Sequence, residues 1–250
     1  MEQAGRLACA DGLELAYLLT PGSSPTVVFL PGFRSDMQGA KAVEVAGLCA
    51  ARGTGCLRLD YTGHGASGGR FEDGTIGRWL ADALAVIEAH AGPRPLLVGS
   101  SMGGWIALLA ALRLRAAGVP SSGLVLIAPA VDFTQGMWDG FPIDVKREIE
   151  ERGHWPRPSA YAPESTPITR ALIEDGRRHL LLGRPIEPGC PVHILQGMQD
   201  PDVPWPHAMT LLEHLPGEET TLTLVKDGDH RLSREGDLAL LVRTVAGMAG

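Results

Sequence analysis

Three polar residues of this chain could together activate a nucleophile. Ser101 is the central residue of Gly99-Ser100-Ser101-Met102-Gly103, a G-x-S-x-G pentapeptide. A serine hydroxyl is a poor nucleophile at neutral pH, so it needs a histidine that takes its proton and a carboxylate that orients the histidine. Asp200 and His230 follow in that order along the chain. This set predicts acyl transfer through a covalent intermediate on Ser101.

The sequence on either side of the pentapeptide, more than the motif itself, favours Ser101 as the nucleophile. A second copy of the pattern, residues 65–69, runs into the polar stretch 70–74, where no helix can start. The copy around Ser101 lies between an apolar strand, residues 95–98, and an apolar helix. That order of strand, sharp turn and helix exposes a nucleophile, and the flanking glycines let strand and helix approach closely. We therefore expect strained backbone angles at Ser101.

The acid and the base are expected in loops that follow core strands. Asp200 follows an apolar strand, and Asp202, two residues on, is the alternative acid. His230 comes directly after the last predicted strand, beside Asp229. A histidine in a loop beside acidic residues ordinarily has only a structural role. The catalytic interpretation of His230 is favoured because Ser101 and Asp200 are present with it. The histidines expected to be surface or hydrogen-bonded residues are His90, His154, His179, His193, His207 and His214.

Acyl transfer also needs N–H donors for the negative oxygen of the tetrahedral intermediate. Removing one such donor costs about 3 to 4 kcal/mol of transition-state stabilisation. The N–H of Met102, directly after the nucleophile, is one candidate. The backbone N–H of Phe33, in the loop that follows an apolar strand ending at Leu30, is the second. The glycine-rich run from Asp60 to Ser67, which includes His64, suits a tight structural turn nearby.

Strands and helices alternate along the chain, which is typical of βαβ units that build a parallel sheet. Residues 1–130 and 189–250 are expected to form this α/β core. The expected strands are 13–19, 26–30, 56–59, 96–98, 124–128, 192–195 and 221–225. The expected helices are 38–51, 76–91, 102–117, 205–214 and 235–248.

The alternation stops in residues 131–188, a proline-rich insertion with two expected short helices, 143–152 and 168–182. Its position between two sheet strands predicts a helical lid over a binding cleft; a packed structural excursion is the alternative. Aromatic residues in or near it could line an apolar acyl channel, although simple packing would explain them equally well. They are Trp138, Phe141, Trp155, Tyr161 and Trp205.

Composition and spacing argue against several functional classes. The chain has 22 Lys and Arg against 29 Asp and Glu, a net charge of −7, and its basic residues are scattered. We therefore expect neither nucleic acid nor an anionic membrane surface as a partner. No His, Asp or Glu cluster has metal-ligand spacing such as H-E-x-x-H. The pattern Gly63-x-Gly65-x-x-Gly68 opens no helix, so we expect no dinucleotide and no other cofactor.

The four cysteines and the N-terminal residues bear on location. The cysteines lack C-x-x-C or Cys/His spacing and are expected to be structural thiols in a reducing compartment. Residues 1–11 lack a basic start followed by an apolar stretch, and no run reaches the roughly 18 apolar residues of a membrane span. We expect a cytoplasmic protein, whose oligomeric state the sequence does not define.

With these residues in place, the chain resembles the α/β-hydrolase superfamily, and within it the mitochondrial palmitoyl-protein thioesterases and acyl-glucuronide esterases. The stretches that carry the resemblance are 29–33, 58–61, 98–105, 146–150, 153–155, 197–205 and 229–231. It implies a mostly parallel eight-stranded sheet flanked by helices, with Ser101, Asp200 and His230 as nucleophile, acid and base. The motif G-x-x-D-x-x-V-P in that superfamily favours Asp200 over Asp202. An Ala-, Arg- and Gly-rich chain without a transit peptide looks bacterial, so mitochondrial location is not expected to carry over.

The leading functional interpretation is a serine hydrolase that cleaves acyl thioesters or oxyesters, carried on a protein or a small molecule. The resemblance favours a palmitoyl-protein thioesterase-like activity. The alternatives are a small-molecule carboxylesterase, an acyl-glucuronide esterase and a peptidase. A hydrolase-fold module that only binds a ligand or partner is the competing class, although such modules usually lose one catalytic residue.

Overall fold

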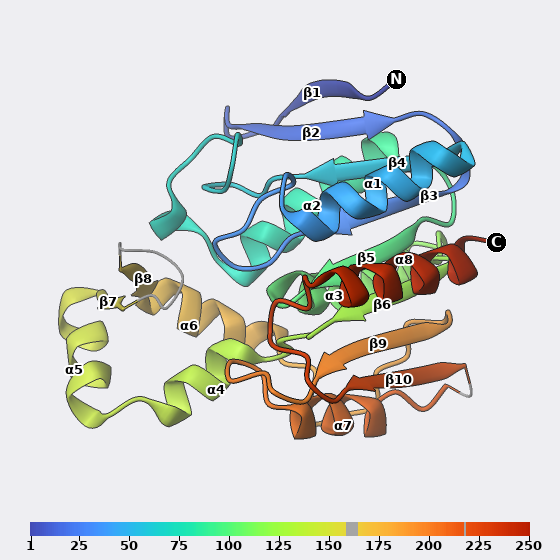
Figure 1. Ribbon diagram of the computed structural model, residues 1–250. Coiled ribbons are helices and arrows are strands. Elements are labelled where there is room, and N and C mark those ends of the chain that lie inside the picture. The colour runs from blue at the N-terminus through green and yellow to red at the C-terminus, as the bar shows by residue number, and fades with distance from the viewer. Residues whose placement is uncertain (159–164, 218) are drawn as a thin grey trace.

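A twisted β-sheet runs through the molecule, with helices on both faces (Figure 1). The computed structural model describes residues 1–158, 165–217 and 219–250. In this part of the chain the sheet has eight strands in the order β1-β2-β4-β3-β5-β6-β9-β10. In this sheet β4, β3, β5, β6, β9 and β10 are parallel to one another, whereas β2 pairs antiparallel with both β1 and β4. Their bounds are β1 Gln3–Ala8, β2 Glu14–Thr20, β3 Ser23–Leu30, β4 Thr54–Leu59, β5 Leu96–Ser100, β6 Gly123–Ile127, β9 Val192–Gly197 and β10 Thr220–Val225.

Helices cover both faces because the central strands are apolar on both sides. Alternate strand residues point to opposite faces, so Val98 of β5 packs with α1 and α8, and Leu97 packs with α2 and α3. The helix α3 is buried on nearly its whole circumference, since it packs between the sheet and its neighbouring helices. The helix bounds are α1 Ala40–Arg52, α2 Ile76–His90, α3 Met102–Ala116, α7 Trp205–Glu213 and α8 Glu235–Ala249. The predicted mostly parallel eight-stranded sheet is confirmed.

The strand β1 was not expected from the sequence. Its side chains alternate only between exposed and half-buried, because it lies at the sheet edge and pairs with β2 alone. A half-buried edge strand has little hydrophobic contrast to reveal it. Most predicted core elements are otherwise confirmed to within a few residues: the helix expected over 102–117 ends at Ala116.

The insertion between β6 and β9 lies at the end of the sheet toward which the arrowheads of β5 and β9 point (Figure 1). It contains α4 Phe133–Gly140, α5 Ile143–Arg152, β7 His154–Arg157, β8 Thr166–Thr169 and α6 Arg170–Gly176. The helix predicted over 168–182 is wrong at both ends. Its first residues pair with β7 as strand β8, the Thr169 hydroxyl accepts the Leu172 N–H to start α6, and a short 3-10 turn over Arg177–His179 ends it. The helix α4 and the two-stranded β7–β8 sheet were not predicted.

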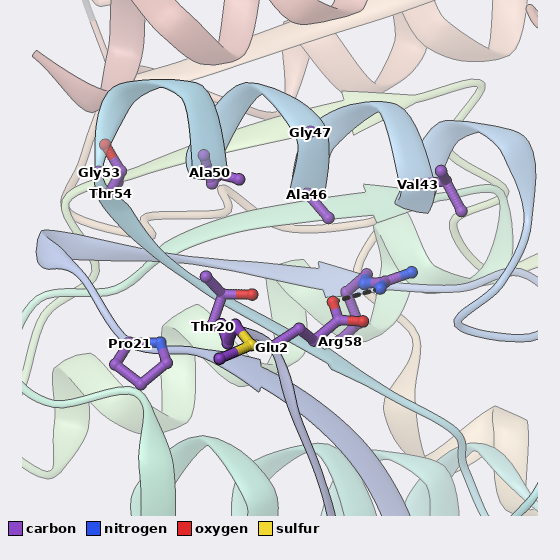
Figure 2. Close-up of a pocket in the computed structure, with 12 residues that line it drawn as sticks. Glu2, Thr20, Pro21, Val43, Ala46, Gly47, Ala50, Gly53, Thr54 and Arg58 are labelled. Carbon is purple, nitrogen blue, oxygen red and sulfur yellow. Dashed lines mark hydrogen bonds and ion pairs between the residues drawn. The ribbon is translucent and has the colours of Figure 1, made fainter.

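A groove of about 460 Å³ lies between α1 and the edge strands of the sheet (Figure 2). At its floor the buried Arg58 of β4 points toward Glu2, whose Oε1 accepts a hydrogen bond of 2.5 Å from the guanidinium. The same guanidinium donates to the carbonyl of Met37 at 2.7 Å. Arg58 therefore ties the residue before β1 to the loop that precedes α1. None of the candidate catalytic residues lines this groove.

Candidate active site

Ser101 occupies a sharp turn between β5 and α3. Its backbone has φ 54° and ψ −119°, a conformation that a residue with a side chain seldom adopts. The Ser101 N–H donates to the carbonyl of Ile127 at 2.8 Å, and the Ser101 carbonyl accepts from Gly104 and Ala130. The expected strain is present, and the surrounding hydrogen bonds hold the serine in it. The hydroxyl is consequently presented at the carboxyl edge of the sheet.

The flanking glycines are required by close backbone contacts. A Cβ on Gly99 would lie 2.2 Å from the carbonyl oxygen of Gly103, and one on Gly103 would lie 2.0 Å from that of Leu30. A Cβ on Gly32 would lie 3.3 Å from the Cβ of Ser101. The turn between strand and helix therefore leaves no room for a side chain at Gly99 or Gly103, and the loop after β3 approaches the serine closely at Gly32.

Ser101, His230 and Asp200 form a hydrogen-bonded row. His230 Nε2 lies 3.1 Å from Ser101 Oγ, and His230 Nδ1 lies 2.7 Å from Asp200 Oδ2. The Asp200 side chain has no exposed surface, whereas that of His230 is 16% exposed. The three residues come from the ends of β5, β9 and β10, which meet because these strands are parallel. This geometry is what the predicted roles of nucleophile, base and acid require.

Asp200 is held as a carboxylate by several donors. Its Oδ1 accepts the N–H groups of Asp202 and Val203, both at 2.8 Å, and its Oδ2 accepts from Gln196 Nε2 at 3.1 Å. Burial opposes ionisation, yet the hydrogen bonds from His230, Val203 and Asp202 lower the pKa of Asp200 below its ordinary value. The alternative acid, Asp202, is exposed and contributes its N–H to Asp200.

Asp200, Asp202 and His230 also bring ligand-type atoms within 4.8 Å of one another. A metal ion would need a lone pair on a histidine nitrogen. Here Nδ1 of His230 is engaged with Asp200, and Nε2 faces the serine hydroxyl. The donor set therefore fits proton transfer better than metal binding.

The loop that carries His230 is joined to the acid loop through the backbone. The Gln199 N–H donates to the Gly228 carbonyl at 2.8 Å, and a Cβ on Gly197 would lie 2.4 Å from that same oxygen.

Lys41, at the start of α1, donates to the carbonyl of Arg231 at 2.5 Å. Burial, together with the charge of Arg231, lowers the pKa of Lys41 to about 8. No sequence motif pointed to Lys41, whose contact spans 190 residues.

The two predicted oxyanion donors lie on the loops that meet at Ser101. Met102 is the first residue of α3, and Phe33 follows Gly32, where an added Cβ would lie 3.3 Å from the Cβ of Ser101. Within the described residues, neither Phe33 N–H nor Met102 N–H donates a hydrogen bond to another group. Both N–H groups are thus available to a ligand, and their catalytic role stays a prediction.

The side chain of Phe33 anchors its loop in an aromatic cluster that the sequence did not indicate. Its ring packs edge-on against Phe71, Trp79 and Phe133, with centroids 5.0, 5.8 and 5.6 Å away. Such pairs each contribute about 0.5 to 1.5 kcal/mol beyond area burial. The loop after β3 is therefore fixed to η1 (Phe71–Asp73), α2 and α4.

The glycine-rich turn after β4 supports the same loop, in line with its expected structural role. Asp60 accepts the N–H groups of Met37 and Ala66 at 2.7 and 2.8 Å, and burial raises its pKa. His64 Nε2 accepts the Arg34 N–H at 3.2 Å, and burial lowers the pKa of His64 to about 4. His64 is therefore neutral at physiological pH and acts as an acceptor.

The aromatic residues predicted to line an acyl channel fall into two groups. Trp138, Phe141 and Trp155 pack around the buried Ile149, Ile168 and Ile173 of the insertion, and the same cluster includes Phe33. The rings of Phe141 and Trp155 are 5.3 Å apart. Trp205 is the first residue of α7, is 36% exposed and is not part of this cluster. Tyr161 lies outside the described residues.

Comparison with known proteins shows the family to which this chain belongs. Residues 27–241 match the alpha/beta hydrolase family. The chain belongs to this family. The palmitoyl-protein thioesterase ABHD10, mitochondrial, of Bos taurus is 38% identical over 240 residues, which cover 96% of this chain and 78% of the bovine protein.

Two solved structures are similar to this alpha/beta hydrolase over nearly the whole chain. A putative hydrolase from Agrobacterium vitis S4 is 46% identical with a TM-score of 0.95, and the match covers 100% of this chain and 99% of the other. Mouse alpha/beta hydrolase domain-containing protein 10 is 34% identical with a TM-score of 0.90, covering 98% of both chains. The recognition of the hydrolase fold and of its ABHD10 relatives is confirmed. No helix in the described part of the chain is long and apolar enough to cross a membrane.

Proposed function

We propose that this alpha/beta hydrolase is a serine hydrolase that cleaves acyl thioesters or esters through an acyl-enzyme on Ser101. The observation that supports it most is the row Ser101, His230 and Asp200, built on a strained serine at the carboxyl edge of the sheet. The hydrolase family and the thioesterase relatives agree with this chemistry.

The proposed reaction has two steps. In the first, His230 Nε2 takes the proton of Ser101 as Oγ attacks the acyl carbonyl, and the N–H groups of Phe33 and Met102 bind the oxyanion. The C–S or C–O bond then breaks, and the protonated His230 gives its proton to the leaving group. In the second step, His230 activates a water that attacks the acyl-enzyme, which releases the acid and regenerates Ser101. Asp200 orients the imidazole throughout.

The substrate class we favour is an acyl thioester of the palmitoyl-protein type, because relatives at 35% to 38% identity are named palmitoyl-protein thioesterases. A thiol leaving group with a pKa of about 8.5 needs little protonation by His230, unlike an alkoxide. A small-molecule carboxylesterase or acyl-glucuronide esterase is the second candidate, since the same site would serve an oxyester. Peptidase activity is a weaker alternative. A module that only binds is disfavoured because all three catalytic residues are present.

We further propose that residues 131–188 act as a lid and that its cluster of Trp138, Phe141 and Trp155 contacts the acyl group. The supporting observation is that this cluster packs on the side chain of Phe33, whose backbone is the proposed oxyanion donor. An acyl chain leaving Ser101 beneath the insertion would meet these apolar side chains. We extend the same role to Tyr161, from its sequence position, and to Trp205 at the start of α7.

We propose a cytoplasmic location, although the ABHD10 relatives are named mitochondrial. Support comes from the four cysteines, none of which forms a disulfide, as is usual in a reducing compartment. Fractionation of cells that express the protein, with markers for each compartment, checks this assignment.

Labelling by a fluorophosphonate probe tests the catalytic proposal. We expect the wild-type protein to label and Ser101→Ala to remain unlabelled while folded. The matched control is Ser67→Ala, which alters the second G-x-S-x-G pentapeptide and should label like the wild type. Equal labelling of Ser101→Ala, or a folded wild-type protein that does not label, would sink the proposal. Rates on palmitoyl-CoA, p-nitrophenyl esters of increasing acyl length and an acyl glucuronide then rank the substrate classes.

A further inference from the structure

Arg34 directly follows Phe33, the proposed oxyanion donor, and is held in an unusual backbone conformation. Its φ is 60°, in the left-handed region that favours glycine. The Arg34 N–H donates to His64 Nε2 at 3.2 Å, which fixes this conformation. The residue is exposed, whereas Gly32, two residues earlier, is buried against Ser101. A cationic side chain is thus mounted on the loop whose Gly32 adjoins the nucleophile.

The guanidinium of Arg34 lies over the ring of Phe71, 4.9 Å from its centroid. The Phe71 ring is itself buried and packs against Phe33, so the cation rests on the aromatic cluster that anchors the oxyanion loop. Stacking on a ring face leaves the N–H groups at the guanidinium edge free to donate.

No acidic partner satisfies this cation within the described residues. The guanidinium of Arg34 forms no ion pair with any of them, although many other arginines of the chain do. Asp36 is the acid closest in sequence, and its Oδ1 accepts the N–H of Gln38 in its own turn. His64, beneath Arg34, is neutral because burial lowers its pKa to about 4. The Arg34 guanidinium is therefore exposed, held over the Phe71 ring and unpaired among the described residues.

We propose that Arg34 binds an anionic group of the substrate, a carboxylate or a phosphate, close to the scissile carbonyl. Two parallel N–H donors of a guanidinium can bind two oxygens of a carboxylate or of a phosphate. This inference rests on the proposed serine hydrolase function and adds to it a preference for acyl derivatives that carry such a group. The negative group can belong to the acyl part or to the leaving group, and the experiment distinguishes these two sources.

Two pairs of esters separate these sources. The first pair is mono-p-nitrophenyl adipate, which carries its carboxylate on the acyl part, and its methyl ester. The second is the hexanoyl ester of 4-hydroxyphenylacetic acid, which carries it on the leaving group, and its methyl ester. The readout is the ratio of kcat/KM for the anionic ester to that for its neutral partner, measured for the wild type, Arg34→Gln and Arg70→Gln.

We expect Arg34→Gln to lower this ratio about tenfold in one of the two pairs, with neutral-ester turnover retained. The control Arg70→Gln removes the same charge from an exposed residue that pairs with Glu72 and should change the ratio less than about twofold. A ratio that Arg34→Gln leaves unchanged in both pairs, or that Arg70→Gln lowers equally, would overturn the assignment of Arg34. If neither neutral ester turns over and the wild type does not label, the proposed function itself fails.

Discussion

The carboxyl edge of the sheet and the insertion that faces it are built in different ways. At the sheet edge, the side chain of Asp200 has no exposed surface and meets four donors, and glycines allow backbone contacts that no side chain could enter. In the insertion, a small apolar cluster carries the packing, and ion pairs such as Arg170–Glu174 are exposed. In the proposed function, the rigid edge would hold the chemistry and the insertion would select the acyl group.

The largest expected effect lies in the acid of the proposed triad. Asp200→Asn keeps the shape of the side chain but favours the wrong imidazole tautomer, so kcat should fall by about 10⁴. Asp202→Asn is the matched control and should reduce kcat less than about threefold. Steady-state kinetics on a p-nitrophenyl ester measures both variants. A larger loss in Asp202→Asn would transfer the acid role to that residue.

Two glycine substitutions contrast the packing of the two regions. Gly103→Ala would place a Cβ 2.0 Å from the carbonyl oxygen of Leu30, so we expect the free energy of unfolding to fall by more than about 3 kcal/mol. Gly136→Ala, at an exposed position of helix α4 with no atom within 4 Å of the new Cβ, should raise it by about 0.5 to 1 kcal/mol. Urea unfolding of both variants gives the comparison. An equal decrease in the free energy of unfolding for both variants would show that the sheet edge is packed no more tightly than the insertion.

His64 should make stability fall in acid. The unfolded pKa of a histidine is about 6.5, and burial lowers the folded pKa of His64 to about 4. The unfolded state then binds more protons in this window, so stability is full above pH 6.5 and is lost as the pH falls toward 4, by at most about 3 kcal/mol. His64→Gln should flatten this slope in urea unfolding between pH 6.5 and 4.5.

A matched substitution in the insertion, at the exposed His154, provides the control. His154→Gln should leave the wild-type slope in place. If the slope of His64→Gln also equals that of the wild type, another group is responsible for acid sensitivity.

Lys41 should affect the rate through the position of His230. Lys41→Met removes the donor to the Arg231 carbonyl, next to the base, so kcat should fall about tenfold with little change in KM. Lys41→Arg should restore part of the rate. The control Lys146→Met removes a lysine that lies over Trp138 in the insertion and should leave kcat unchanged. A change in thermal stability without a change in kcat would make Lys41 merely structural.

The smallest effect is expected in the insertion's apolar cluster. Trp155→Ala should reduce kcat/KM for long-chain p-nitrophenyl esters about threefold and leave the acetate ester unaffected, because only a long acyl chain reaches the ring. The fall in activity should grow with acyl length. A uniform fall across all lengths would indicate that Trp155 supports the fold and not the acyl group.

The parts of the site that could be predicted are those set by local rules. Ser101 is marked by strand, turn and helix in order, and Asp200 and His230 follow strands whose carboxyl ends must meet. Lys41 could not be predicted, because nothing near it in sequence shows that it reaches residue 231. The strand β1 was not predicted because its side chains show little hydrophobic contrast. The bounds of the helix expected over 168–182 were wrong because the sequence did not reveal that Thr169 caps α6 or that the preceding residues pair with β7.

The central claim is that Ser101 accepts the acyl group. Acid quenching of the enzyme during turnover of a p-nitrophenyl ester, followed by proteolysis and mass spectrometry, locates that group directly. We predict one added acyl group on the peptide that contains Ser101, absent from Ser101→Ala and greatly reduced in His230→Gln. An acyl group on any other residue, or hydrolysis of the ester by folded Ser101→Ala at the wild-type rate, would contradict the account.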